Sequence, residues 1–348
     1  MVRITFFILI SIASIYFAQS GLSIPQNPLG PLAVGKYPPP DWIKPGVVLV
    51  YHVEGGSRTA GEGSGSALYS TGFIIMIVTN VVRNSVYGIT LSCFTRPDIM
   101  LTPPQVYVLN GIAFVTPREI EDILSRRDEY AKDGIAVGGG KTENGYFLTV
   151  SYKTSTTMIE VDETGKVIQF SFRETNPSFS QVAMGRFLEQ TRANWIFTDS
   201  FPRVAMGSYT YTLGSYSPIT GYASSIGTSK ISFLNVRDGL ALYDQTITIQ
   251  DPSSGIPIHQ TNRIFGVPSY GPFYVHPDLL RVQTIIEIPG VNFRWYNEPS
   301  QLGYGIDSVI EVNGVEILRT TFDEEGLTIK SILYSMGIYM MAELQMSE

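Results

Sequence analysis

Cysteine is almost missing from this chain of 348 residues, in which Cys93 is the single example. One cysteine excludes an intramolecular disulfide and any metal site built from several thiolates. Because Cys93 lies in an apolar stretch with the alternation of a strand, we interpret it as a buried small hydrophobic residue. The fold must then be held together by a hydrophobic core, which a chain of this length can form.

Charged residues are also few. They make up 16% of the chain, the net charge is −7, and no cluster of Lys and Arg occurs. A surface that follows a phosphate backbone needs such clusters, so the sequence predicts no nucleic-acid partner. A hydrophobic fraction of 44% excludes a disordered chain. The abundance of Tyr, Phe, Gly and Pro favours strands and turns over helices.

Long hydrophobic runs are absent except near the N-terminus. Arg3 precedes the apolar residues 4–18, and the small residues Ala18 and Ser20 suit a cleavage site. We therefore predict a secretory signal over residues 1–20 and a protein that is secreted or displayed at the cell surface. The run is shorter than the roughly 20 residues that span a bilayer. The alternative is an uncleaved anchor, in which case the protein would contact a membrane through this segment alone.

Seven prolines fall within residues 21–45. Proline fixes φ and removes a backbone donor, so this segment is predicted to be an extended spacer and not a sheet strand. The sequence leaves two uses open. The spacer could hold the folded body away from a surface, or it could wrap around the first domain.

A motif of glycine, an aromatic residue, valine and proline occurs twice, at residues 111–117 and 271–277. The two copies are 160 positions apart (277 − 117 = 160), and the later turns at Asp162 and Asp323 are 161 apart (323 − 162 = 161). Such matching offsets predict a tandem duplication. The predicted segments are a signal peptide (1–20), a Pro-rich spacer (21–45), a first β-rich repeat (46–178), a helical connector (179–204) and a second β-rich repeat (205–348).

Runs of β-branched and aromatic residues separated by polar turns predict antiparallel strands throughout both repeats. Thr116, Pro117 and Glu119 have the spacing of a helix N-terminus, and a shorter helical piece follows Pro277. A further helix is predicted over residues 180–195 from apolar residues at roughly helical spacing. The predicted fold class is mainly β (α+β): two tandem duplicated antiparallel-sheet domains, each a curved sheet or half-barrel with one inserted helix.

No motif specifies catalysis. The glycines before Lys141 lack the spacing and the following helix of a phosphate loop. The three histidines are not spaced as metal ligands, and His276 occupies the position of Thr116 in the repeat, where a helix cap is expected. Asp162 and Asp323 fit turns of the type Asp-x-x-Gly, although two carboxylates brought together could bind a cation or exchange protons. We predict no catalytic residue, no metal and no cofactor.

The second repeat is rich in tyrosine, a residue that contacts partners, glycans and apolar ligands. The leading prediction is an exported, non-catalytic protein that binds an apolar or glycan-type ligand in a sheet concavity or in the cleft between the repeats. The alternative is a structural or adhesive component of the cell envelope, with other envelope proteins as partners. An enzyme ranks third because it would need charged residues from both repeats to converge. The candidate ligand-binding residues are Tyr209, Tyr211, Tyr270, Tyr274 and His276.

Overall fold

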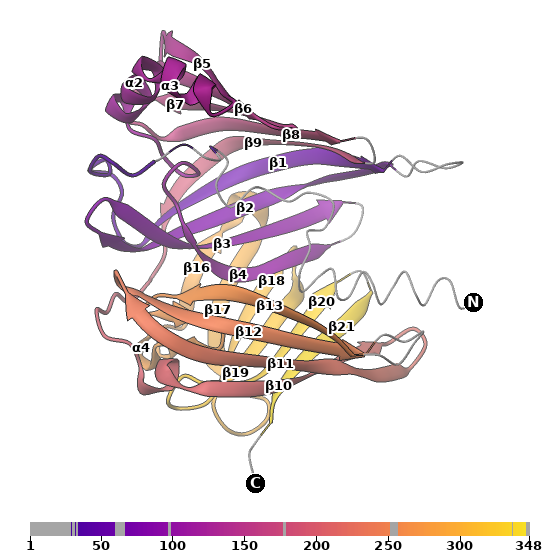
Figure 1. Ribbon diagram of the computed structural model, residues 1–348. Coiled ribbons are helices and arrows are strands. Elements are labelled where there is room, and N and C mark those ends of the chain that lie inside the picture. Colours follow the sequence, from indigo (N-terminus) through magenta and orange to yellow (C-terminus); the bar gives the residue numbers. More distant parts are fainter. Residues whose placement is uncertain are drawn as a thin grey trace.

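The computed structural model describes residues 29, 32, 34–59, 67–96, 99–176, 179–250, 257–335 and 337–345. The predicted signal over residues 1–20 lies outside this part of the chain. Two large antiparallel sheets dominate the structure, with a few short helices, and neither sheet closes into a complete barrel (Figure 1). Within the described residues, no helix has the length and hydropathy needed to cross a membrane.

The first sheet has nine strands in the order β4-β3-β2-β1-β9-β8-β7-β6-β5. Its helices α2 (Pro117–Ser125) and α3 (Arg127–Lys132) lie between β4 and β5 in the chain. The strands are β1 (Val47–Thr59), β2 (Ala67–Val82), β3 (Ser85–Arg96), β4 (Met100–Val108), β5 (Ile135–Thr142), β6 (Gly145–Tyr152), β7 (Ser155–Asp162), β8 (Val167–Asn176) and β9 (Phe179–Arg192).

The second sheet has ten strands in the order β13-β12-β11-β10-β21-β20-β19-β18-β17-β16. Its strands are β10 (Ser208–Ser217), β11 (Tyr222–Arg237), β12 (Leu240–Gln250), β13 (Pro257–Gly266), β16 (Thr284–Ile288), β17 (Phe293–Pro299), β18 (Ile306–Val312), β19 (Val315–Phe322), β20 (Thr328–Ser335) and β21 (Ile338–Leu344). The remaining elements are η1 (Arg203–Met206), η2 (Pro289–Val291), α4 (Pro277–Leu280) and a separate pair of short strands, β14 (Tyr270–Gly271) and β15 (Tyr274–Val275).

The two sheets share one topology. In each sheet the first strand pairs with the second and also with the last, as β1 does with β2 and β9 and as β10 does with β11 and β21. Equivalent hydrogen bonds recur as well: Tyr51 donates to the carbonyl of Val167 at 2.9 Å, and Tyr211 donates to the carbonyl of Thr328 at 3.1 Å. The predicted fold class, two duplicated antiparallel sheets with inserted helices, is confirmed.

The helix predicted over residues 180–195 is wrong. Residues 179–192 form β9, which pairs with both β1 and β8. Burial alternates along this strand, with Ala183 buried and Val182 and Met184 each 42% exposed. Apolar residues therefore lie on both faces of β9, and their spacing imitates a helical stripe although the true period is two.

Strands β1, β2 and β3 have buried side chains on both faces. On β1, Leu49 and Tyr51 point into the core of the first repeat, whereas Val48 and Val50 belong to a second core. That second core also contains residues of the second sheet such as Leu213. Because alternate residues of a strand point to opposite faces, these three strands separate the two cores. The first repeat thus fills much of the concave side of the second sheet.

The concave side of the first sheet is filled from within its own repeat. Ile120 and Ile123 of α2 pack there together with Leu29 and Leu32 from the Pro-rich segment. Of the two uses left open by the sequence, the described part of this segment shows the second, because it wraps around the first repeat.

Glu119 holds the wrapped segment to α2. Thr116 caps the helix as predicted, accepting from the Glu119 N–H at 3.2 Å. The Glu119 carboxylate in turn accepts from the backbone N–H groups of Gly35 and, at 3.1 Å, of Lys36. Burial raises the pKa of Glu119, and the backbone hydrogen bonds from Lys36, Gly35 and Thr116 only partly oppose this shift.

Candidate ligand-binding cavity

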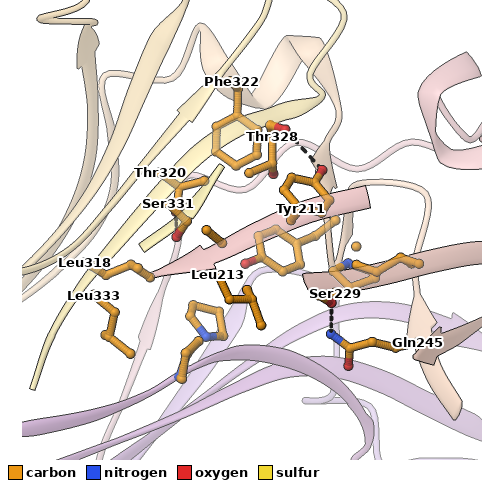
Figure 2. Close-up of a pocket in the computed structure, with 17 residues that line it drawn as sticks. Tyr211, Leu213, Ser229, Gln245, Leu318, Thr320, Phe322, Thr328, Ser331 and Leu333 are labelled. Atoms are coloured by element: carbon orange, nitrogen blue, oxygen red, sulfur yellow. Dashed lines mark hydrogen bonds between the residues drawn. The ribbon is translucent and has the colours of Figure 1, made fainter. Parts of the chain in front are cut away.

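The concave face of the second sheet is not completely filled. Large side chains such as Leu213, Leu318 and Phe322 point into it, but small ones, Ser229, Ser331 and Ala342, lie among them. Small residues between large ones leave space where a tightly packed core would have none. The result is a cavity of about 150 Å³ beside β10, β11, β19, β20 and β21 (Figure 2).

The polar groups of the cavity wall hydrogen-bond to one another. Gln245 donates through Nε2 to the Ser229 hydroxyl at 3.0 Å, and the hydroxyls of Thr320 and Ser331 are 3.1 Å apart (Figure 2). Tyr211 is held by its hydrogen bond to the Thr328 carbonyl. No Asp, Glu, Lys, Arg or His is among the residues that line the cavity in the described chain. The wall is therefore uncharged, and most of its polar atoms are already satisfied.

Strand β4 of the first repeat closes the cavity from the other side. It contacts β13, β14, β19 and β20 of the second repeat. Beyond this closure lies a groove of about 660 Å³ between the edge strands β4 and β13, with Val106 and Phe265 among its apolar lining. Arg263 is the charged residue of this lining, and its guanidinium is 3.1 Å from Asp244. The cavity and the groove adjoin because both are lined by Pro103, Pro104, Gln245, Tyr270, Gly271 and Pro272.

A third, much smaller void of about 10 Å³ shares Pro104, Tyr270 and Phe322 with the cavity, and we call it the inner void because most of its lining residues are buried. Asn297 lines it and is only 6% exposed. The Asn297 Nδ2 donates to the carbonyls of Leu279 and Val282, each at 2.8 Å, which fixes the orientation of the amide. Within the described chain, the Oδ1 atom of Asn297 is buried and has no hydrogen-bond partner.

Two of the five residues predicted from the sequence line this space, Tyr211 and Tyr270. The other three lie elsewhere: Tyr209 packs on Phe273, Tyr274 donates to the Val267 carbonyl at 2.8 Å, and His276 caps α4 by accepting from the Asp278 N–H at 3.3 Å. Burial raises the pKa of Tyr211 and Tyr270 well above the usual value for tyrosine, so both hydroxyls are neutral.

The lining residues that sequence reasoning missed are mainly Pro103, Pro104 and Gln245. The two prolines signal an edge strand, because proline cannot donate to a sheet ladder. Which surface this edge would cover depends on the packing of β4 against a strand more than a hundred residues away, and no local pattern encodes that contact.

The aspartates of the two repeats have structural roles. Asp162 accepts from the N–H groups of Thr164 (2.9 Å) and Lys166 (3.0 Å). Asp323 accepts in the same way from Glu325 (3.0 Å) and Leu327 (2.8 Å). Each carboxylate thus stabilises its own turn. Among the described residues, no three or more His, Cys, Asp or Glu side chains are grouped so that they could hold a metal ion.

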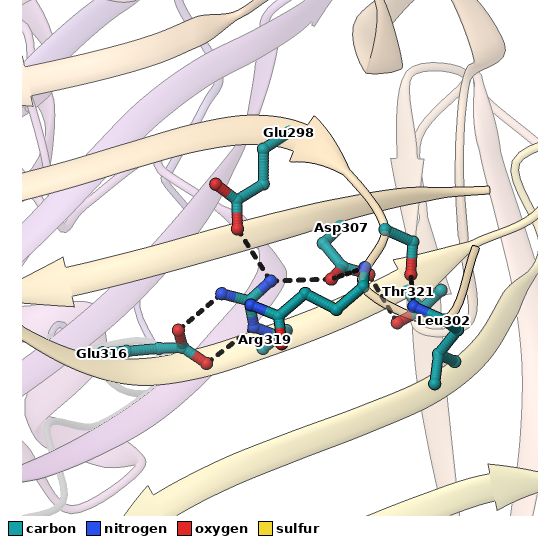
Figure 3. A network of polar contacts seen from close by, with 8 residues as sticks. Glu298, Leu302, Asp307, Glu316, Arg319 and Thr321 are labelled. Carbon is teal, nitrogen blue, oxygen red and sulfur yellow. Dashed lines mark hydrogen bonds and ion pairs between the residues drawn. The ribbon is translucent and has the colours of Figure 1, made fainter. Parts of the chain in front are cut away.

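A polar network braces the outer side of the cavity wall. On β19, Leu318 and Thr320 line the cavity, and Arg319 between them lies on the opposite face of the strand. Figure 3 shows Arg319 among the carboxylates of Glu298, Asp307 and Glu316. The Arg319 guanidinium contacts three carboxylates, those of Asp307 (2.7 Å), Glu298 (2.8 Å) and Glu316 (2.6 Å). Asp307 is 1% exposed and also accepts from the Thr321 hydroxyl at 2.7 Å.

The ion pair with Arg319 and the neighbouring hydrogen bonds keep Asp307 ionised. Burial by itself would raise the pKa of Asp307, but hydrogen bonds from Thr321 and Arg319, with those from Ser300 and Gln301, lower it below its usual value. The network therefore contains a buried carboxylate that is ionised, and it ties β17, β18 and β19 together.

Sequence comparison gives no relative: no protein-family model matches this chain, and no curated protein is significantly similar to it. Several solved structures show a distant likeness to this chain. A protein of unknown function of the DUF3598 family from Nostoc punctiforme is 8% identical, with 93% of this chain and 100% of that chain covered and a TM-score of 0.15.

A mutant of the vaccine antigen transferrin binding protein B from Haemophilus parasuis is 7% identical, with 88% and 77% of the two chains covered and a TM-score of 0.16. A β-barrel-like protein of the DUF1849 family from Brucella abortus is 8% identical, with 85% and 96% covered and a TM-score of 0.15. Scores this low carry no argument about function.

Proposed function

We propose that this chain is a non-catalytic binding protein that holds a small, predominantly apolar molecule in the cavity and groove between its two repeats. One observation supports this most strongly. A cavity of about 150 Å³ and an adjoining groove of about 660 Å³ are lined by apolar and uncharged polar side chains, with Arg263 at the outer part. Ligand pockets are typically concave, mostly apolar and equipped with a few fixed polar groups.

The lining favours an apolar ligand over a glycan. A glycan presents many hydroxyl groups, and each would need a free partner in the wall. Ser229, Thr320 and Ser331 are engaged with other wall residues. We also propose that the protein is exported, and the support for this is the sequence of residues 1–20.

A substitution that fills the cavity tests the proposed function. Ala342→Phe places a ring in the space of about 150 Å³ beside Leu213. We expect the affinity for the neutral fluorescent probe N-phenylnaphthylamine to fall by about tenfold or more, because the ring occupies the volume that the probe needs. The measurement is a fluorescence titration of the purified protein, with thermal unfolding to show that the variant folds.

The matched control is Ala223→Phe, which adds the same ring at an exposed position of β11. The control should bind the probe as the wild type does. If Ala342→Phe folds and binds the probe with unchanged affinity, the proposed site is wrong. If the wild type does not bind the probe at all, the proposed function loses its support.

A further inference from the structure

Tyr270 lies where the three spaces meet, since it lines the cavity, the groove and the small inner void. Its ring packs against two tryptophans that also contact each other, with centroid distances of 6.3 Å to Trp195, 6.0 Å to Trp295 and 5.9 Å between the two tryptophans. No hydrogen bond from the Tyr270 hydroxyl to another described residue is present. A neutral donor thus belongs to the lining shared by the cavity, the groove and the inner void.

The wall of the inner void contains a hydrogen-bond acceptor, the Oδ1 atom of Asn297. The Asn297 Nδ2 donates to the carbonyl of Leu279 in α4 and to that of Val282 just after the helix, so the atom of this amide that has no partner in the described chain is Oδ1. A buried acceptor without a partner costs about 1–3 kcal/mol, which a donor in the void would recover. The volume of about 10 Å³ accepts one group of the size of a hydroxyl or a water molecule.

Charge is excluded from these inner spaces. Neither the cavity nor the inner void is lined by an ionisable carboxylate, ammonium, guanidinium or imidazole group in the described chain. Moving an ion from water into such a site costs several kcal/mol when no opposite charge is present to pair with it. Arg263 lines only the outer groove, and Asp244 already pairs with it.

We propose that the ligand is an uncharged, elongated alcohol that enters hydroxyl first. Its hydroxyl donates to the Asn297 Oδ1 and accepts from the Tyr270 hydroxyl, its first carbons fill the cavity, and the rest of its chain lies along the groove. This inference rests on the proposed function and adds the chemical class and the orientation of the ligand.

The test compares octanol, its methyl ether and octanoate by isothermal titration calorimetry on the wild-type protein at neutral pH. The ether accepts a hydrogen bond but cannot donate one, and octanoate carries a charge. We expect octanol to bind about tenfold more tightly than the ether, since one lost hydrogen bond is worth about this factor. Octanoate should bind more weakly still.

Tyr270→Phe keeps the ring and removes the hydroxyl, so the variant is expected to fold. It should lower the affinity for octanol about fivefold. The control, Tyr209→Phe, removes a hydroxyl from a tyrosine that packs on Phe273 outside the cavity, and it should leave the affinity unchanged.

The outcomes separate the inference from the proposed function. Equal affinity for octanol and its ether would mean that the void holds only a water molecule, and this would overturn the inference. Octanoate binding as tightly as octanol, or an unchanged affinity of Tyr270→Phe for octanol, would overturn it as well. In those three cases an apolar ligand still binds and the proposed function stands. If none of the three compounds binds, both fail.

Discussion

Replacing Arg319 with methionine is expected to lower the free energy of unfolding by about 3 kcal/mol at neutral pH. The methylene groups of the side chain keep their packing, but the buried Asp307 loses its cation, and an unpaired buried charge is strongly unfavourable. Chemical denaturation measures the loss. The control is Arg294→Met on β17. The Arg294 side chain is 48% exposed and its guanidinium is 4.0 Å from Glu311, so this change should cost less than about 1 kcal/mol.

The pH dependence of stability provides a second test of the Arg319→Met prediction. The pKa of Asp307 is lowered in the folded state, so its contribution to stability is present above the unfolded pKa of about 4 and is lost as the pH falls through the lower folded value. Without Arg319 that contribution is gone, and the difference between wild type and variant should shrink in acid. Adding Asp307→Asn to Arg319→Met should restore part of the stability. A difference that is constant with pH would show that lost packing, and not the buried charge, is the cause.

Replacing Glu119 with alanine should release the segment that wraps around the first repeat. The change removes the acceptor of the Gly35 and Lys36 N–H groups, and the loss of two charge-assisted hydrogen bonds should cost about 2 kcal/mol. Hydrogen exchange should show faster exchange at these two amides, and denaturation should show the loss of stability. The control is Glu121→Ala on the same helix. This position is exposed, and within the described chain its carboxylate accepts only a surface hydrogen bond from the Tyr146 hydroxyl, so we expect a change within about 0.5 kcal/mol.

The ionisation of Glu119 also makes a prediction with a definite sign. Its folded pKa is raised above 4.5, so the folded state binds the proton more tightly than the unfolded state does. The extra stability that protonation of Glu119 gives the folded state is therefore fully present below the unfolded pKa and is lost as the pH rises through the raised folded value, whereas the hydrogen bonds from the Gly35 and Lys36 N–H groups remain in the ionised state. Glu119→Gln, which does not titrate, should gain stability relative to the wild type over that interval. A constant difference between the two would contradict the assignment.

Those parts of the fold that depend on short stretches of chain were predictable. Thr116 and Pro117 begin a helix because the cap and the fixed φ act within one turn. The paired turns at Asp162 and Asp323 follow from their Asp-x-x-Gly pattern. The duplication was visible because matched offsets do not require any knowledge of packing.

The contacts between repeats were not predictable. Tyr209, Tyr211 and Tyr274 all belong to the tyrosine-rich second repeat and cannot be told apart by composition. Of these three, only Tyr211 lines the cavity. Whether an apolar residue packs in a core or lines a void depends on what covers it, and here the cover is β4 from the other repeat. The sequence does contain one indication that β1 is covered on both sides. Its first residues form an unbroken apolar run, which is typical of a strand with both faces buried.

Strands β1–β3 contribute side chains to both cores, and this has a consequence for biosynthesis. The ribosome releases the first repeat before the second, so the surface that fills the second sheet exists before that sheet is complete. In the natural order of translation, the strands that cover the concave face of the second sheet are therefore made first. A circular permutant that begins with the second repeat would reverse this order. The second sheet would then be synthesised before the strands that cover its concave face. Leu213 and Trp295 would be exposed to solvent until translation ends, and this exposure would favour aggregation.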